Sequence, residues 1–266
     1  MGWEPIARAE FAAAWASRVT KVLLLIFALV VILNAYIFPI VEGYGLTTTD
    51  FAMDIAGDVA FVLAIIGLLL GYKAIVEERR SGQLRIVLAL PHSRRDVVAG
   101  KYLGRGGLLA VAVLASMMLA GALVVYPFGS LELGSYLGFI LFSILLGFVF
   151  LGIGMTISTA VSTERRSTAA TFAVFFVFVL IWDDVPGIIE FLLGQAGIHE
   201  GPLPDWAMFI HATDPISVYE RVVDGLLGGL SFEPWYMDAW IALVIFAAWV
   251  VIPLGLGTWR FEVTDL

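Results

Sequence analysis

The sequence predicts an all-α membrane protein with six transmembrane helices, built as a single domain over residues 1–266. Its residues are 61% hydrophobic and only 14% charged, whereas soluble domains carry roughly a quarter of charged residues. Several apolar runs also reach the roughly 20 residues that cross a hydrocarbon core of about 30 Å. The chain has no cysteine, which excludes disulfides, thiol catalysis and cysteine metal sites.

We expect a helix over residues 3–18, before the first span. Aromatic and small apolar residues recur in it at every fourth position: Trp3, Ala7, Phe11 and Trp15. This spacing places them on one slowly drifting helical stripe, and tryptophan favours the membrane–water interface. We interpret the segment as an interfacial helix that lies in the headgroup plane, with a soluble-facing N-terminal helix as the alternative.

Six apolar segments follow that are long enough, or nearly long enough, to span the bilayer. We place them at about residues 22–40, 59–76, 107–126, 136–161, 168–182 and 239–258. The fifth is the shortest, because about 15 residues of helix cover only about 22 Å. We expect the bilayer to thin there, Arg165 and Arg166 to snorkel, or the chain to re-enter the membrane through residues 188–193.

The outer region after the fifth span, residues 183–238, is too long for a plain connection, and we expect it to be structured. Asp214 and Pro215 are a typical helix start, with Asp at the N-cap and Pro at the first helical position. Apolar residues then recur at spacings of three and four: Ile216, Tyr219, Val222, Val223, Leu226 and Leu227. This pattern predicts an amphipathic helix that packs on the ends of the spans and ends at Gly228 and Gly229.

Lysine and arginine are distributed very unevenly among the connections. Fourteen of the fifteen lie in the N-terminal segment, residues 73–105, residues 162–167 and the C-terminal tail, and the remaining one is Arg221. Cytoplasmic connections are enriched in these residues. We therefore predict a multi-pass protein of the cell membrane with both termini, and the loop of residues 77–105, in the cytosol.

The acidic residues favour the other side, where fifteen of the twenty-three are found, and only three of the basic residues are lysine. An acid-rich, lysine-poor surface is what adaptation to high salt would produce, as in a halophilic archaeon. An electrostatic funnel for a cationic substrate is the alternative interpretation, and the two can coexist.

The chain carries no catalytic, metal or cofactor motif that survives inspection. Gly100-Lys101 is not a phosphate-binding loop, because Tyr102 replaces the required Ser or Thr and Arg95 stands where glycine is needed. The predicted spans have no ionisable side chain in their central parts, which argues against an ion-coupled carrier. We therefore predict no enzymatic activity and no directly bound cofactor or metal.

The loop between the second and third spans contains a distinctive series of residues. Paired glutamates leave the second span, and a Ser-Gly-x-Leu step, a short helix, a Leu-Pro-x-Ser-Arg turn and a Gly-Lys-x-x-Gly run follow. The positions are Glu77, Glu78, Ser81, Gly82, Leu84, Leu90, Pro91, Ser93, Arg94, Gly100, Lys101 and Gly104. Within its six-span layout, this series resembles the permease subunits of the ABC type 2 (exporter-like) superfamily. It looks most like the small six-span group that includes the permease associated with nitrous-oxide-reductase maturation, although Asp214 replaces an asparagine of that group.

The resemblance implies the permease subunit of an ATP-driven transporter that works by alternating access. ATP and magnesium would be bound by a separate cytosolic ABC ATPase subunit, a second permease copy would complete a homodimer in the bilayer, and no nucleic acid would be involved. It also implies that the loop of residues 77–105 contains the coupling helix. We expect the ATPase contact at Glu77, Glu78, Ser81, Gly82, Leu84, Val87, Leu88, Pro91, Ser93, Arg94 and Lys101.

The spacing of Leu84, Val87 and Leu88 fits this expectation, because it would form a short apolar ridge that could sit in a groove on another protein. A helix held on the anionic inner leaflet by its arginines is the alternative.

Two other functions stay in view. A membrane enzyme acting on lipid would need ionisable groups clustered at a span end, and only Asp183 and Asp184 approach this. They would contact substrate on the outer face, or merely end a helix. A structural or sensory membrane protein without transport is the third hypothesis.

Overall fold

The computed structural model describes residues 2–43, 46–84, 93–126, 129–197 and 203–263. Within these ranges the chain is almost entirely helical and forms no strand beyond a single isolated bridge between Thr47 and Ser130. Among the described residues, six helical stretches are long and apolar enough to cross a membrane. The predicted all-α, six-span fold is therefore confirmed.

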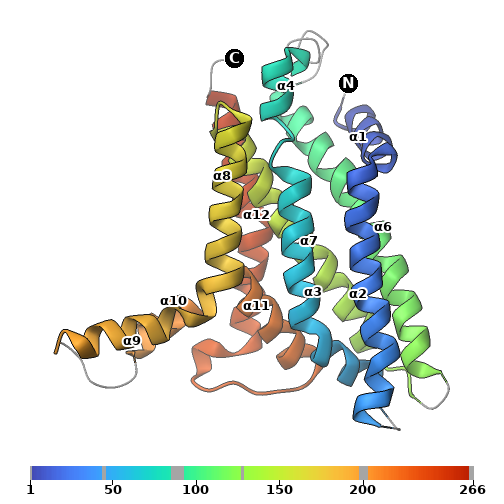
Figure 1. Ribbon diagram of the computed structural model, residues 1–266, viewed down its shortest axis with the longest axis vertical. Coiled ribbons are helices and arrows are strands. Elements are labelled where there is room, and N and C mark those ends of the chain that lie inside the picture. The colour runs from blue at the N-terminus through green and yellow to red at the C-terminus, as the bar shows by residue number, and fades with distance from the viewer. Residues whose placement is uncertain (1, 44–45, 85–92, 127–128, 198–202, 264–266) are drawn as a thin grey trace.

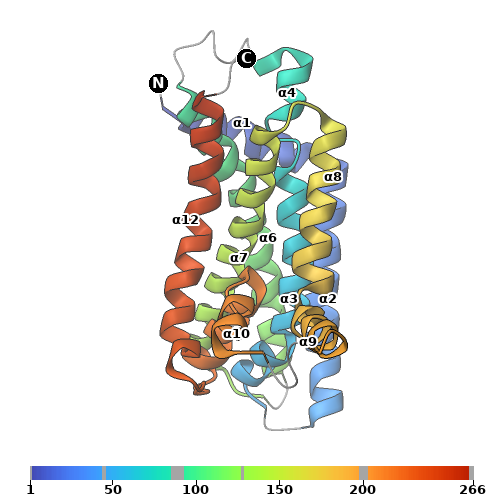
Figure 2. The same ribbon diagram turned by 90° about the vertical axis from the view of Figure 1, so that its left-hand side faces the viewer.

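Long helices run side by side and form an upright bundle (Figures 1 and 2). They are α2 (Arg18–Glu42), α3 (Thr48–Gly71), α6 (Arg94–Val125), α7 (Leu133–Ala160), α8 (Glu164–Phe175) and α12 (Ala239–Val263). Shorter helices cover the two ends of the bundle. They are α1 (Glu4–Ala16), α4 (Val76–Ser81), α9 (Val185–Gln195), α10 (Asp205–His211) and α11 (Pro215–Val222).

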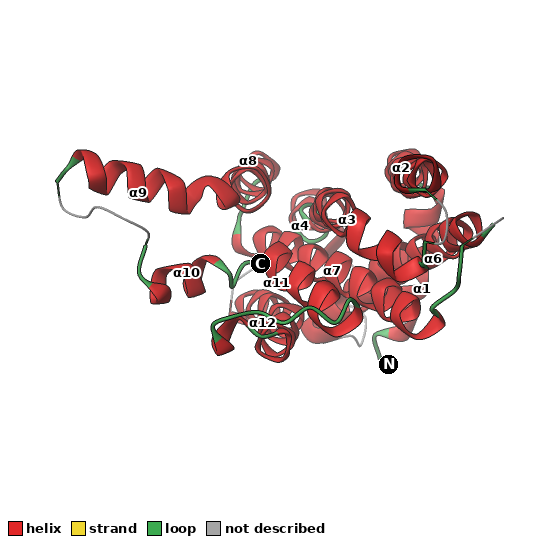
Figure 3. Cartoon of the chain, turned by 90° about the horizontal axis from the view of Figure 1, so that it is seen from below, coloured by secondary structure: helices red, strands yellow, loops and turns green. Residues whose placement is uncertain are grey.

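The two ends of the bundle differ in charge and in the helices they carry. Both termini lie at one end with α1 and α4, and we call this the basic end (Figure 1). The opposite end carries α9, α10 and α11, and we call it the acidic end. Viewed from the acidic end, α7 and α11 lie in the middle, α2 and α8 stand at the rim, and α9 extends away from α8 (Figure 3).

Helices α3 and α7 form the centre of the bundle with their backbones in contact. A Cβ atom built on Gly67 would lie 2.8 Å from the Gly147 carbonyl oxygen, and one on Gly71 would lie 2.5 Å from the Leu151 carbonyl oxygen. Only glycine fits at these crossings, because a Cβ atom would overlap the facing backbone. Small residues at such positions let membrane helices approach closely. This seam joins the second and fourth spans at the centre of the bundle.

The fifth span begins earlier than the sequence suggested. Thr163 caps α8, so the helix starts at Glu164, inside the turn expected at residues 162–167. Helical residues continue through a π-helical segment, Phe176–Ile181, before a short 3-10 turn at Trp182–Asp184. Counted from Glu164, the helix is about 27 Å long. It therefore nearly matches the hydrocarbon core of about 30 Å, which the predicted span of about 15 residues did not.

Helix α11 has the start that the sequence predicts. The Asp214 carboxylate accepts hydrogen bonds from the Ile216 and Ser217 amides at 2.9 and 3.1 Å. Tyr219 is fully buried, and its hydroxyl lies 2.8 Å from that of Ser143 on α7. The predicted amphipathic helix is thus confirmed, and it packs on the ends of the spans.

Candidate functional site

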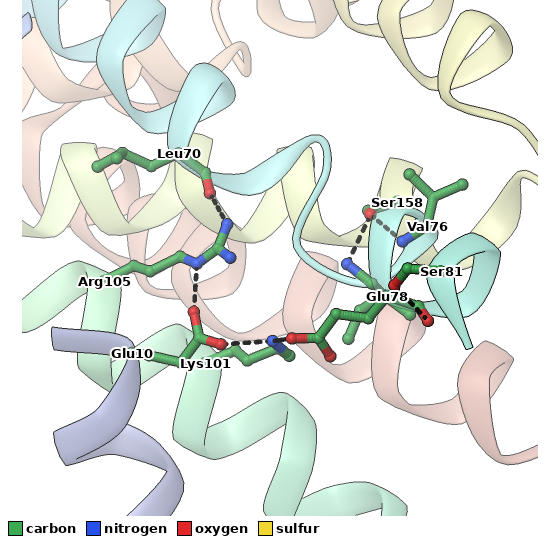
Figure 4. Close-up of polar contacts among 9 residues, drawn as sticks. Glu10, Leu70, Val76, Glu78, Ser81, Lys101, Arg105 and Ser158 are labelled. Atoms are coloured by element: carbon green, nitrogen blue, oxygen red, sulfur yellow. Dashed lines mark hydrogen bonds and ion pairs between the residues drawn. The ribbon is translucent and has the colours of Figure 1, made fainter. Parts of the chain in front are cut away.

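A cluster of ionic contacts joins four helices at the basic end (Figure 4). We call it the junction and define it by Glu10 of α1, Glu78 of α4, Lys101 and Arg105 of α6, and the Leu70 carbonyl of α3. The Lys101 ammonium lies 2.5 Å from the Glu10 carboxylate and 2.6 Å from that of Glu78. Lys101 therefore connects the N-terminal helix to the short helix that follows the second span.

Arg105, one turn further along α6, completes the junction. Its Nε donates to the other Glu10 carboxylate oxygen at 2.8 Å, and its Nη1 donates to the Leu70 carbonyl at 2.6 Å. The Leu70 carbonyl belongs to the last turn of α3, where unpaired carbonyls and the helix dipole favour a cation. Arg105 thus links α1 to the end of the second span.

Two glycines allow α1 to approach α6 closely enough for these contacts. A Cβ atom on Gly100 would lie 2.9 Å from the Trp3 carbonyl oxygen, and one on Gly104 would lie 2.5 Å from the Ala7 carbonyl oxygen. Neither distance leaves room for a side chain. The Gly-Lys-x-x-Gly run therefore forms the docking site of α1 on the third span, and its lysine reaches Glu10.

Burial makes the junction costly to open. The Lys101 side chain is only 2% exposed, against 15% for Glu10 and 20% for Glu78. Burial alone would raise the pKa of the Glu10 carboxyl, but attraction to Arg105 and Lys101 outweighs it and holds that pKa below its ordinary value. Removing one partner of a buried ion pair leaves an uncompensated charge, at a typical cost of about 3–5 kcal/mol.

Helix α4 is also held from the side of α7. The Ser158 hydroxyl accepts hydrogen bonds from the backbone amides of Ile75 and Val76, both at 3.0 Å. These amides are at the start of α4, where helix donors have no partner within the helix. A single buried serine of the fourth span thus fixes where the second span ends and α4 begins.

The neighbouring span α8 contacts the same region through Glu164. This carboxylate lies 3.3 Å from the Lys73 ammonium and 3.0 Å from the Arg80 guanidinium. The pairs are partly exposed, so each contributes little on its own. Together with Lys101 and Ser158, they tie α4 to the first helix and to the third, fourth and fifth spans.

The start of α6 and the end of α12 are joined as well. Ser93 and Asp96 form a capping box at the start of α6. Arg94 donates to the carbonyls of Phe261 and Glu262 at 2.7 and 3.1 Å, and Arg95 pairs with the Glu262 carboxylate at 2.5 Å. The sixth span therefore ends against the residues that start the third.

The structure divides the residues expected to contact an ATPase into two groups. Glu77, Ser81 and Ser93 are exposed, and Gly82 ends α4 with a φ of 77°, a left-handed conformation that favours glycine. Glu78, Arg94 and Lys101 make the internal contacts described above. Val87, Leu88 and Pro91 lie outside the described residues.

Leu84 differs most from what its spacing suggested. It is 1% exposed and belongs to the main hydrophobic core, so its side chain is not presented to a partner in this structure. The periodicity identifies an apolar position correctly, but the packing against the spans decides which way that position faces.

Glu10 is the junction residue that sequence reasoning missed. The available signal was the spacing of Gly100, Lys101, Gly104 and Arg105, which puts two small and two basic residues on neighbouring parts of one helical surface. Such a surface suits a second helix that carries an acid, and α1 has one in Glu10.

The acidic end carries a second group of ionisable residues. Asp183 and Asp184 are exposed at the bend between α8 and α9. Burial, followed by the negative charges of Asp183, Asp214 and Asp224, raises the pKa of Glu220 to about 7. Among the described residues, no group of three or more His, Cys, Asp or Glu side chains is placed to hold a metal ion.

Comparison with known proteins gives a consistent assignment. Residues 5–266 match the sequence profile described as ABC-2 family transporter protein. The chain is similar to the probable ABC transporter permease protein NosY of Pseudomonas aeruginosa, with 31% identity over 96% of each chain. It is also similar to the probable ABC transporter permease protein NosY of Stutzerimonas stutzeri, with 30% identity over 79% of this chain and 77% of that one.

Proposed function

The chain belongs to the ABC-2 transporter family and is a permease subunit of an ABC transporter, and we propose that an ATPase subunit drives it through the junction at the basic end. ATP and magnesium are bound by that separate subunit, and the permease converts its movement into a switch between inward and outward access of the spans.

The single observation that carries this proposal is the attachment of α4. Lys101 ties α4 to α1 and α6, Ser158 ties it to α7, and Glu164 ties it to α8. A force applied to α4 reaches several spans at once, because each attachment is short and Lys101 is buried. A loosely connected loop would bend under the same force and would not move the spans.

The partner surface consists of the exposed side chains around α4 and the start of α6. Its described members are Glu77, Ser81, Gln83, Ser93 and Arg95. Gln83 and Leu84 are helical and begin the coupling helix expected at residues 83–90, the rest of which lies outside the described residues. In this arrangement the buried Leu84 anchors the coupling helix, and the polar residues beside it orient the bound ATPase subunit.

The distribution of lysine and arginine supports a cytosolic position for the basic end. Fourteen of the fifteen lie in segments that this end connects, and such an excess marks the cytoplasmic side of a membrane protein. Both termini are then cytosolic, and the ATPase reaches α4 directly.

A second permease copy completes the transporter in this proposal. The resemblance to the ABC type 2 superfamily implies it, and the rim position of α8 supports it (Figure 3). This helix and its continuation expose a row of large apolar side chains: Phe172, Phe176, Val177 and Leu180. Such a face suits a homodimer in which the transport path lies between two copies.

The acidic end fits two proposals that the charge pattern raised. Its acids, including the exposed pair Asp183 and Asp184, would keep the surface hydrated in a high-salt environment such as that of a halophilic archaeon. They would also concentrate a cationic substrate near the outer opening of the path.

Co-purification tests the docking site. We would pair the permease with its ATPase and replace exposed Glu77 and Ser81 together by arginine, with Ser231→Arg on an exposed loop of the acidic end as the matched control. The ATPase should be lost from the first variant and retained by the control, while both permeases keep their thermal stability. Retention of the ATPase by the first variant would contradict the proposed docking site.

A further inference from the structure

A pocket lined by aromatic rings lies at the acidic end, between α10 and the short 3-10 turn that precedes α12. Its volume is about 860 Å³, which is within the usual range of ligand pockets. Four aromatic side chains and one carboxylate form most of its lining. We call it the aromatic pocket and define it by these five residues: Asp205, Trp206, Phe209, Trp235 and Tyr236.

The aromatic rings of the pocket meet edge to face. The ring centroids of Phe209 and Tyr236 are 5.6 Å apart with the planes inclined at 83°, and those of Trp235 and Tyr236 are 5.9 Å apart at 78°. Such contacts leave ring faces uncovered. Trp206 and Trp235 are also 67% and 77% exposed, so most of their surface is not used in packing and is accessible to a ligand.

The aromatic pocket carries a negative charge without a positive one beside it. Burial, followed by the negative charge of Asp205 and a hydrogen bond to its carboxylate, raises the pKa of Tyr236. Arg221 is the one basic residue of the sequence between positions 167 and 259, and it is buried and donates to two backbone carbonyls. The described lining therefore contains no lysine or arginine, and a cation that balances Asp205 has to come from outside the chain.

Ring faces beside a single carboxylate suit an organic cation better than a metal ion. Hard metal ions take several oxygen ligands, whereas the aromatic pocket offers one carboxylate, and no described group of three or more His, Cys, Asp or Glu side chains is placed to hold a metal. A quaternary ammonium has no N–H group to donate and carries its charge behind methyl groups. Aromatic faces attract such a cation through the negative charge of their π-systems.

We propose that the aromatic pocket binds a trimethylammonium group, with its methyl groups against the rings of Trp206 and Trp235 and its charge balanced by Asp205. The group belongs either to a soluble compound such as choline or to a phosphatidylcholine headgroup, because both present the same chemistry. The proposal names the class of cation that the acidic end would attract, so its meaning for transport rests on the proposed function. Binding itself requires neither ATP nor the ATPase subunit.

A binding assay on the full chain, purified in maltoside detergent without its ATPase, tests the proposal. Radiolabelled choline would be the probe in a scintillation proximity measurement, with unlabelled choline and its neutral tert-butyl analogue as competitors. The two competitors have nearly the same shape and differ in charge. We expect choline to compete at least roughly tenfold better than the neutral analogue. Absence of choline binding, or equal competition by the two compounds, would overturn the proposal.

Variants of the lining locate the bound choline. Trp206→Ala and Asp205→Asn should each weaken binding roughly tenfold without changing the unfolding midpoint. Trp240→Ala is the matched control for the ring, since Trp240 is also 67% exposed but does not line the pocket, and exposed Glu233→Gln is the control for the charge. Natural affinity in both lining variants would overturn the proposal. Trp235→Ala, at a side chain that is 77% exposed, replaces Trp206→Ala should that variant fail to fold.

Nanodiscs distinguish the two sources of the trimethylammonium group. Phosphatidylcholine and phosphatidylethanolamine are both zwitterionic, but only the first carries trimethylammonium. If lipid headgroups occupy the aromatic pocket, soluble choline should bind more weakly in phosphatidylcholine nanodiscs than in phosphatidylethanolamine nanodiscs. Equal affinity in the two would assign the pocket to a soluble compound, and absence of choline binding in both would overturn the proposal while leaving the ATPase-driven function untouched.

Discussion

The Lys101 ammonium lies 2.6 Å from the Glu78 carboxylate, so a buried ion pair links the third span to the short helix after the second. The same ammonium lies 2.5 Å from Glu10. One side chain of α6 thus contacts both α1 and α4. Lys101 is therefore the residue of the basic end through which α1, α4 and α6 are joined.

Replacing Lys101 with methionine should destabilise the protein by about 3 kcal/mol, because Glu10 and Glu78 lose a partner while remaining largely buried. The change is measured as a lower midpoint of thermal unfolding in detergent. Lys73→Met is the matched control, since the Lys73 side chain is 35% exposed and pairs with Glu164 at 3.3 Å. That pair should contribute less than about 1 kcal/mol. Equal effects of the two variants would contradict the central position of Lys101.

Gly104→Ala should release α1 from the third span, because the added Cβ would lie 2.5 Å from the Ala7 carbonyl oxygen. We expect faster proteolysis within residues 4–16 and a lower unfolding midpoint, with a loss of about 1–3 kcal/mol. Gly107→Ala tests the specificity, since its nearest contact is 3.7 Å away on the Phe11 ring. If Gly104→Ala left α1 as resistant to proteolysis as Gly107→Ala does, the close approach would not hold the helix.

Glu220 should make the protein less stable as the pH rises. Its folded pKa of about 7 lies above the ordinary value of 4.5, chiefly because of burial. The folded state therefore binds this proton more tightly than the unfolded state, so the contribution is complete below about pH 4.5 and is lost as the pH rises towards 7. Glu220→Gln should gain about 1–3 kcal/mol over the natural protein at pH 8 and nothing at pH 4. Exposed Glu233→Gln should show no such difference, and a pH-independent gain in Glu220→Gln would refute the assignment.

The paired replacement of Asp183 and Asp184 by asparagine should leave folding and ATPase binding intact, because both side chains are exposed. If these acids attract a cationic substrate, transport should fall and its salt dependence should weaken. Unchanged transport at low salt would mean that the two acids only end a helix and do not attract the substrate. The measurement is uptake or efflux in vesicles at low and high ionic strength.

Local signals made most of the fold predictable. The helix at Asp214 and Pro215 and the six spans follow from capping residues, proline position and apolar length, and each of these acts within a few residues. The start of the fifth span was missed because charged Glu164, Arg165 and Arg166 suggested a turn, whereas Thr163 caps a helix there.

The site was harder to predict, because its contacts join distant parts of the chain. Glu10 and Lys101 are 91 residues apart, and no spacing rule connects them. The apolar spacing around Leu84 predicted a ridge that faces a partner, whereas Leu84 itself is buried, because its direction depends on the spans against which it packs. Gly100 and Gly104 were visible as a motif, while their physical reason, the approach of α1, appears only in the folded chain.

The central claim, that Lys101 transmits movement of the ATPase to the spans, is tested by a distance measurement across the acidic end. Spin labels at Asp54→Cys and Asp184→Cys, both exposed, would report the separation of the second and fifth spans in the complex with the ATPase, before and after ATP is trapped. The separation should change in the otherwise natural protein and stay constant in Lys101→Met, although the ATPase still co-purifies with both. An equal change in Lys101→Met would contradict transmission through the junction.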